Sequence, residues 1–272
     1  AAVVHDQNGT PVAGVIVTWS ATGGGVLSRT QDTTDAAGLT TVTLTLSPSA
    51  GRQTAQASVT GLIGSPLSFM DDAVAGNPVR IAVHAGDFQV GAVTTSLRLP
   101  HSVLVSDAYG NPTPSVIVQW AVGDGGGLVN EAGVASTVTN SLGLASVSRT
   151  LGPAAGAYSD TATAVGLPGS PVIFSDTAGA LFTIQVGNDF FRPQIDTVPT
   201  GSFLRFVWVS GGNLHNITWD PGDPTPPLPD SPNESALNAS FLVRVTGIGS
   251  YGYHCAYHGG VGTGVFGVIV TE

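Results

Sequence analysis

A single cysteine and two histidines form the most reactive combination of side chains in this sequence. Cys255 is the only cysteine of the chain, and His258 follows it by three residues. Because one thiol cannot form an internal disulfide, it is either a small core residue or a metal ligand or nucleophile. His215 stands forty residues upstream, between two β-like segments. One thiolate and two imidazoles suit a soft-to-borderline ion, and this donor set is typical of a blue-copper site.

The residues around these side chains occur in an order that resembles the cupredoxin family. The resemblance covers about the last third of the chain. The segments similar to the family's strands, turns and ligand loops are Phe182–Val186, Phe191–Pro193, Val198–Gly201, Phe203–Val209, His215–Asn216, Tyr253–Gly260 and Phe266–Thr271. A lone Cys-x-x-His pattern would be a weak signal, whereas this ordered set is fairly specific. It implies a Greek-key β-sandwich over residues 180–272.

The resemblance also implies a ligand set. His215, Cys255 and His258 correspond to the equatorial ligands of one type 1 copper ion. Asn216 corresponds to the asparagine that joins the two ligand loops by hydrogen bonds, and such outer partners orient metal ligands. The alternative for Asn216 is an ordinary turn residue.

The axial position departs from the family pattern. Family members usually place a methionine a few residues after the last histidine, but the only methionine of this chain is Met70, far upstream. Val265 is the best match for that position and Val261 is the second, and neither side chain ligates a metal. Two interpretations therefore stay open: copper held by three ligands, or a site that has lost its metal.

His254 needs a separate interpretation. It precedes Cys255, and strand alternation places the two side chains on opposite faces. In two-domain copper reductases and oxidases a histidine at this position binds a second copper, but that centre needs further histidines. His5, His84 and His101 lie upstream without metal-ligand spacing, so we expect His254 to face solvent. The chain also lacks a nucleophile elbow, a phosphate loop and a paired-carboxylate constellation, and we do not expect an enzyme.

Composition bounds the class of protein. Short alternating segments separated by Gly, Pro, Asn and Asp predict an all-β chain, and 272 residues accommodate three consecutive β-sandwich domains. The formal net charge is −10, which argues against nucleic-acid binding because phosphates require a basic surface. No apolar run approaches the roughly 20 residues that span a bilayer, so we expect no transmembrane segment in this chain.

The first two thirds of the chain contain an internal repeat. Matching pairs of segments are Asp6–Pro11 with Asp107–Pro112, Val15–Trp19 with Val116–Trp120, Thr34–Leu39 with Thr139–Leu144, and Gly64–Phe69 with Gly169–Phe174. Self-similarity of this kind indicates two copies of one unit. Each copy is similar to the bacterial Ig-like repeats of invasin-like surface proteins, with a tryptophan between two sheets. We therefore expect Ig-like domains at residues 1–76 and 77–179, before the cupredoxin-like domain at 180–272.

The two copies differ at their beginnings. About thirty residues (77–106) precede the Asp turn in the second copy, but only Ala1–His5 precede it in the first. The first domain is therefore predicted to lack one or more opening strands. Proteins normally cover such an edge, so we expect preceding residues or a partner chain to cover it.

These features favour an extracytoplasmic, bacterial electron-transfer protein with one type 1 copper and an Ig-like spacer or docking arm. The expected partner is a redox protein or a larger membrane-associated complex, docking at the apolar patch of Gly259, Gly260 and Val261. One alternative is a structural accessory subunit of a redox assembly with an altered or empty copper site. A second alternative, adhesion or scaffolding at a cell surface, rests on the Ig-like repeats alone.

Overall fold

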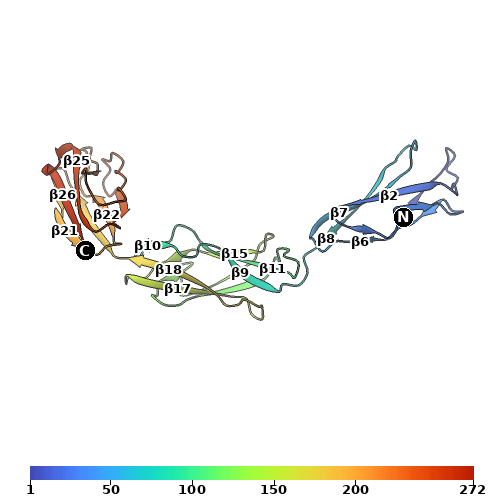
Figure 1. The fold of residues 1–272 in the computed structure, drawn as a ribbon, viewed down its shortest axis with the longest axis horizontal. Helices are drawn as coiled ribbons and strands as arrows, with labels where there is room; N and C mark the ends of the chain where they lie inside the picture. The colour runs from blue at the N-terminus through green and yellow to red at the C-terminus, as the bar shows by residue number, and fades with distance from the viewer.

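The structure, a computed structural model, describes all residues 1–272 and consists of strands connected by turns and loops. Three β-sandwich domains follow one another along the longest axis of the molecule, with the two chain termini in the outer domains (Figure 1). The prediction of an all-β chain is confirmed. No helix is present that could cross a membrane.

The first domain is the smallest of the three. Its strands are β1 (Ala2–Val3), β2 (Ile16–Thr22), β3 (Val26–Leu27), β4 (Gln31–Thr33), β5 (Leu39–Thr40), β6 (Leu44–Thr45), β7 (Gly51–Ser58) and β8 (Leu67–Ala73). The order β4-β2-β7-β8 forms the main sheet, and the pairs β1-β5 and β3-β6 face it. Trp19 of β2 lies buried between the layers and stacks on Phe69 of β8 at 5.7 Å.

The second domain repeats this plan with two additional strands. It contains β9 (Arg80–Ala85), β10 (Val90–Ala92), β11 (His101–Ser106), β12 (Ile117–Val122), β13 (Leu128–Val129), β14 (Val134–Val138), β15 (Leu144–Val147), β16 (Arg149–Thr150), β17 (Gly156–Thr163) and β18 (Val172–Gly179). The sheets have the orders β10-β18-β17-β12-β14, β15-β11-β9 and β13-β16. Trp120 lies buried against Phe174, as Trp19 lies against Phe69. The repeat in the sequence is therefore a repeat in the fold, and β9 and β10 have no counterparts in the first domain.

The third domain is a sandwich of two four-stranded sheets. Its strands are β19 (Leu181–Val186), β20 (Phe191–Arg192), β21 (Ile195–Val198), β22 (Phe203–Trp208), β23 (Thr218–Trp219), β24 (Ser240–Arg244), β25 (Gly249–Gly260) and β26 (Thr263–Thr271). The sheet orders are β20-β19-β22-β24 and β21-β26-β25-β23. Alternating residues of β22, β25 and β26 point inward and form the largest core of the molecule, which includes Phe206, Tyr253 and Cys255.

The domains are joined by short, hydrogen-bonded connections. Asn111 of the second domain donates from Nδ2 to the Pro48 carbonyl at 2.7 Å and accepts from the Ala50 N–H at 2.8 Å. At the other junction only Ala180 separates β18 from β19, and its carbonyl accepts from the Phe203 N–H at 2.7 Å. Short connections of this kind limit the freedom of the domains and suit an extended arm.

Candidate metal centre

Two loops of the third domain bring the candidate ligands together. His215 lies between β22 and β23 and is held by a pair of backbone hydrogen bonds with Glu234, each 2.8 Å long. Cys255 and His258 lie within β25, where the pairing with β26 is interrupted. The register runs regularly from Gly249 to His254 and resumes only at Gly259. The intervening bulge frees both side chains from strict strand alternation.

Glycine on both strands closes this bulge. A Cβ on Gly259 would lie 2.7 Å from the Thr263 carbonyl oxygen and from the Val265 nitrogen, a distance that side chains do not tolerate. Gly264, opposite Gly259, has a φ of +67°, which strongly favours glycine. The glycine-rich tail of the motif is therefore required by the backbone path that follows the ligand loop.

The three side chains meet at one point. Their ligating atoms all lie within 4.8 Å of one another. Cys255 Sγ is 3.4 Å from His258 Nδ1, and the imidazole centroids of His215 and His258 are 4.4 Å apart. His215 and Cys255 are fully buried, whereas His258 is exposed. The group is therefore enclosed on the core side and open to solvent at His258.

His215 provides a test of whether the site suits a metal. Both of its ring nitrogens are buried and neither has a hydrogen-bond partner, although buried polar atoms are normally paired. Burial, followed by the nearby charge of His258, lowers the pKa of His215. A neutral imidazole with a free lone pair, beside a buried thiol, fits a soft-to-borderline ion. The donor set thus agrees with the copper ligands that the sequence implied.

Asn216 links the two ligand loops directly. Its side-chain Oδ1 accepts a hydrogen bond from the backbone N–H of Ala256 at 2.8 Å. Asn216 directly follows His215, and Ala256 directly follows Cys255, so the bond fixes one ligand segment relative to the other. This contact is the one that the cupredoxin resemblance assigned to Asn216.

The two candidate axial residues lie in different environments. Val265 is buried on β26 and belongs to the same core cluster as Cys255. Val261 is 62% exposed at the turn between β25 and β26. Gly259 and Gly260 are half-buried next to it. The predicted docking patch therefore lies at the open end of the hairpin, beside the exposed His258, while Val265 lies on the enclosed side.

Comparison with known proteins adds to this geometry. Residues 1–68 match the family of bacterial Ig-like domains, group 1. The Ig-like prediction is thereby confirmed for the first repeat. No curated protein sequence matches the chain.

Solved structures similar to the chain include an Ig-like protein and cupredoxins. The D0-D1 domain of intimin is 19% identical over 65% of this chain and 85% of that chain, with a TM-score of 0.27. An oxidized mutant of amicyanin is 17% identical over 34% of this chain and 81% of that chain, with a TM-score of 0.28. Oxidized plastocyanin from Dryopteris crassirhizoma is 24% identical over 34% of this chain and 100% of that chain, with a TM-score of 0.29.

The expectation for His254 requires a correction. Its side chain lies on the face opposite Cys255, as alternation predicted, but it does not face solvent freely. His254 Nδ1 lies 2.7 Å from Asp220 Oδ1, and the two side chains are only 14% and 13% exposed. The reason is that β25 pairs with β23, whose strand end carries Asp220 across to His254.

The second Ig-like domain contains a buried charged cluster that sequence reasoning missed. His101, Arg149, Asp160 and Asp176 are all fully or almost fully buried. His101 Nδ1 lies 3.3 Å from Asp160, and His101 Nε2 lies 2.9 Å from Asp176. Arg149 Nε forms an ion pair with Asp160. These four residues come from β11, β16, β17 and β18, so no local spacing signals them.

This cluster pairs its charges internally. The carboxylates of Asp160 and Asp176 lie at the two ring nitrogens of His101, and Arg149 pairs with Asp160. Burial alone would lower the pKa of His101, but the hydrogen bonds and charges of Asp160 and Asp176 outweigh burial and raise it. The guanidinium of Arg149 and the imidazole of His101 thus face the two carboxylates in a fully buried site.

Proposed function

We propose that the third domain binds one copper ion through His215, Cys255 and His258, and that the protein is an electron carrier rather than an enzyme. The observation that supports this most directly is the convergence of three donors on a buried histidine whose nitrogens are otherwise unpartnered. A copper ion at this position would supply a one-electron redox couple. Cys255 and His215 hold the ion away from water, and the exposed edge of His258 gives a partner access.

The surroundings of His258 support a docking role. Tyr257 and Val261 are exposed beside it, and Gly259 and Gly260 add no side chains to this surface. Exposed apolar surface next to a redox centre suits brief contact with a redox partner protein or a membrane-associated complex. In this proposal the protein acts outside the cytoplasm, as Ig-like repeats of surface proteins do. The two Ig-like domains hold the copper domain at a distance as a spacer arm.

Titration of the full chain with Cu(II) tests the proposal. We expect one copper per chain and an intense visible thiolate-to-copper band. Cys255→Ser should lose the band, because it removes the thiolate, and should bind copper far more weakly. His254→Gln is the matched control, since it changes the adjacent residue on the opposite face, and it should keep both signals. Absence of stoichiometric copper in the wild type, or unchanged binding in Cys255→Ser, would exclude electron transfer at this site and favour the structural alternative.

Val265 is expected to set the reduction potential of the loaded protein. A valine donates no electron density and excludes water, which favours the lower charge of Cu(I). Val265→Met places a thioether on the enclosed side of the ligands, and we expect the potential to fall by at least about 60 mV, roughly a tenfold change in a one-electron equilibrium. Val261→Met, at the exposed turn, is the control. Protein-film voltammetry that shows a fall only in Val261→Met would assign the axial role to that residue instead.

A further inference from the structure

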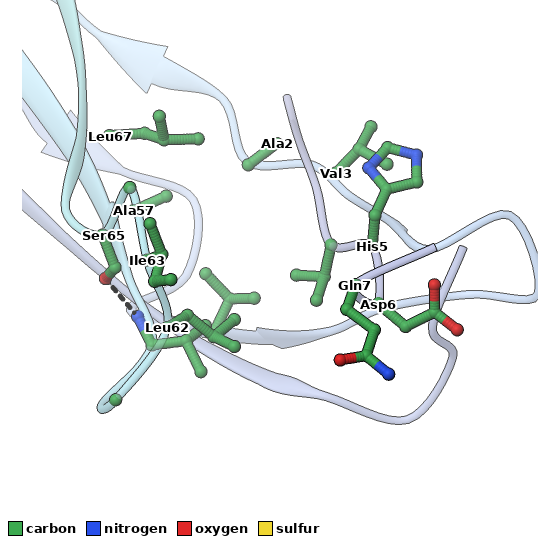
Figure 2. A pocket seen from close by; sticks show the side chains of 15 residues that line it. Ala2, Val3, His5, Asp6, Gln7, Ala57, Leu62, Ile63, Ser65 and Leu67 are labelled. Atoms are coloured by element: carbon green, nitrogen blue, oxygen red, sulfur yellow. Dashed lines mark hydrogen bonds between the residues drawn. The ribbon is translucent and has the colours of Figure 1, made fainter. Parts of the chain in front are cut away.

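Two hollows in the Ig-like domains differ in their chemistry. The hollow of the first domain is lined mainly by apolar side chains, among them Leu62, Ile63 and Leu67 (Figure 2). The hollow of the second domain, called here the Phe88 hollow, has a volume of about 410 Å³ and combines one exposed aromatic ring with hydroxyl and carboxylate groups. It is lined by Phe88, Asp124, Ala157, Tyr158, Ser159 and residues 175–177. An aromatic face beside hydrogen-bonding groups suits a polar ligand that also has an apolar face.

The floor of the Phe88 hollow is the outer face of β17 and β18. Along β18, Phe174 and Asp176 are buried, whereas Ser175 and Thr177 are exposed. On β17, Ser159 lies directly opposite Ser175. The floor therefore presents hydroxyl groups, which both donate and accept hydrogen bonds.

Phe88 forms one wall of the hollow, in the loop between β9 and β10. Its side chain is 79% exposed and its φ is +55°, a left-handed conformation that is unfavourable for a bulky residue. The loop is fixed to β18, since the Phe88 N–H donates to the Ser175 carbonyl at 2.9 Å. The next N–H, that of Gln89, donates to the buried Asp176 Oδ1 at 2.9 Å. Strained residues persist only where the surrounding structure determines them, and they are concentrated at active sites and ligand sites.

Asp124 forms the other wall, in the turn between β12 and β13. The sheet order β10-β18-β17-β12 places it across the floor from the Phe88 loop. The Asp124 N–H donates to Ser159 Oγ at 2.9 Å, and its carbonyl accepts from the Ser159 N–H at 3.1 Å. Its carboxylate lies at the surface and accepts a long hydrogen bond, 3.5 Å, from the Ser159 hydroxyl. The backbone thus fixes Asp124, while its carboxylate is available to a ligand.

We propose that the Phe88 hollow binds a neutral saccharide. The C–H face of a pyranose ring packs on the ring of Phe88, which removes apolar surface of both from water. Sugar hydroxyls donate to the Asp124 carboxylate and exchange hydrogen bonds with the hydroxyls of Ser175 and Thr177. Both walls are already anchored to the floor, so a ligand loses little affinity to ordering them. The site lies in the second domain and does not depend on the copper function proposed above.

The charges around the hollow select the class of ligand. No basic side chain lines it, whereas Asp124 carries a negative charge, so acidic sugars and other anions are disfavoured. A cation is the competing ligand, because an aromatic face and a carboxylate also suit one. The hydroxyls of the floor distinguish the two, since they both donate and accept. Sugar hydroxyls use both capacities, whereas an ammonium group uses acceptors alone.

Titration of the isotope-labelled full chain with maltose, cellobiose, lactose and N,N′-diacetylchitobiose, followed by NMR, tests the proposal. We expect at least one of these sugars to bind with a dissociation constant of about 1 mM or below. The amide signals of Ser159, Ser175 and Thr177 should shift during that titration. Each sugar is neutral and presents C–H faces and hydroxyls, so the set varies only the arrangement of these groups.

Phe88→Gly separates the binding site from the fold. It removes the ring, and binding should weaken at least about tenfold. Because glycine adopts a positive φ without strain, the midpoint of thermal unfolding should stay the same or rise. Tyr109→Ala is the matched control: Tyr109 is another exposed aromatic residue of this domain, 73% exposed, and it does not line the hollow. Its removal should leave sugar binding unchanged.

Two further measurements identify the ligand class. Asp124→Asn should weaken sugar binding by at least about threefold, because a neutral acceptor replaces a charged one. Choline, a cation without a sugar ring, should bind more weakly than the best of the four sugars. The proposal is overturned if none of the sugars binds below about 10 mM, or if Phe88→Gly binds as well as the wild type. Choline binding that exceeds that of every sugar and is lost in Asp124→Asn would overturn it as well, by assigning the hollow to a cation.

Discussion

Replacing Arg149 by methionine should destabilise the second domain by about 3–5 kcal/mol, the usual cost of removing one partner from a buried ion pair. The guanidinium pairs with Asp160 and donates to the Thr150 and Gly126 carbonyls at 2.6 and 2.7 Å. Methionine restores none of these contacts. Asp160 would remain buried without its guanidinium partner, and the carbonyls of Thr150 and Gly126 would lose their donor.

The internal repeat provides the control for this prediction. The first domain has Leu44 where the second has Arg149, and Ala55 where the second has Asp160. The same fold therefore accommodates an aliphatic pair at these two positions. The double variant Arg149→Leu/Asp160→Ala should recover most of the lost stability, because it removes the unpaired charge and leaves His101 with Asp176.

Hydrogen exchange of β17 and β18 in the full chain measures both variants, since it reports the second domain separately from its neighbours. We expect exchange roughly a hundredfold to several thousandfold faster in Arg149→Met, which corresponds to the loss of about 3–5 kcal/mol. In the double variant it should lie within about tenfold of the wild type. If the double variant exchanges as fast as the single one, the cluster is needed for more than charge balance, and the comparison with Leu44 and Ala55 does not apply.

The sequence predicted the all-β class and the repeat because those features are local. A strand shows its alternation within a few residues, and a turn such as Asp6–Pro11 shows its Gly and Pro directly. The candidate ligands were also visible, since Cys255 and His258 are separated by three positions and His215 is marked by its flanking asparagine. The structure brings these three side chains together by a bulge in β25, which the sequence analysis did not predict.

Other features depend on pairings over long distances in the chain. Asp220 covers His254 from 34 residues away, and His101 meets Asp160 and Asp176 only because three strands of the sandwich converge. No spacing rule predicts such contacts, since sheet neighbours are set by topology and register rather than by position in the chain. The first domain is an intermediate case. Comparing the repeats predicted that residues 1–76 lack opening strands present in the second copy, but only the structure shows that Leu67 is left exposed where its counterpart Val172 is buried.

Asn216 is the second position where we expect a large effect. Asn216→Ala removes the bond from the Ala256 N–H, and with it the direct side-chain link between the His215 loop and the Cys255–His258 loop. Partners of this kind in metal sites are typically worth 10–100-fold in metal affinity. We therefore expect copper affinity, measured by competition with a chelator, to fall by about that factor. Asn216→Asp keeps an acceptor oxygen at the same place and should stay close to the wild type.

A general loss of stability in the third domain would also lower its copper affinity, so a second control is needed. Ser231, in the segment between β23 and β24, accepts at its Oγ from the N–H of Ile217, the residue after Asn216, at 2.7 Å in a buried position. Ser231→Ala should lower the free energy of unfolding by about 1–3 kcal/mol, because it leaves a buried donor unpaired, yet it preserves the link between the ligand loops. A larger loss of copper affinity in Asn216→Ala than in Ser231→Ala, at equal or smaller loss of stability, identifies Asn216 as the residue that positions the ligands. Equal losses of copper affinity in the two variants would show that Asn216 only supports the fold of the loop.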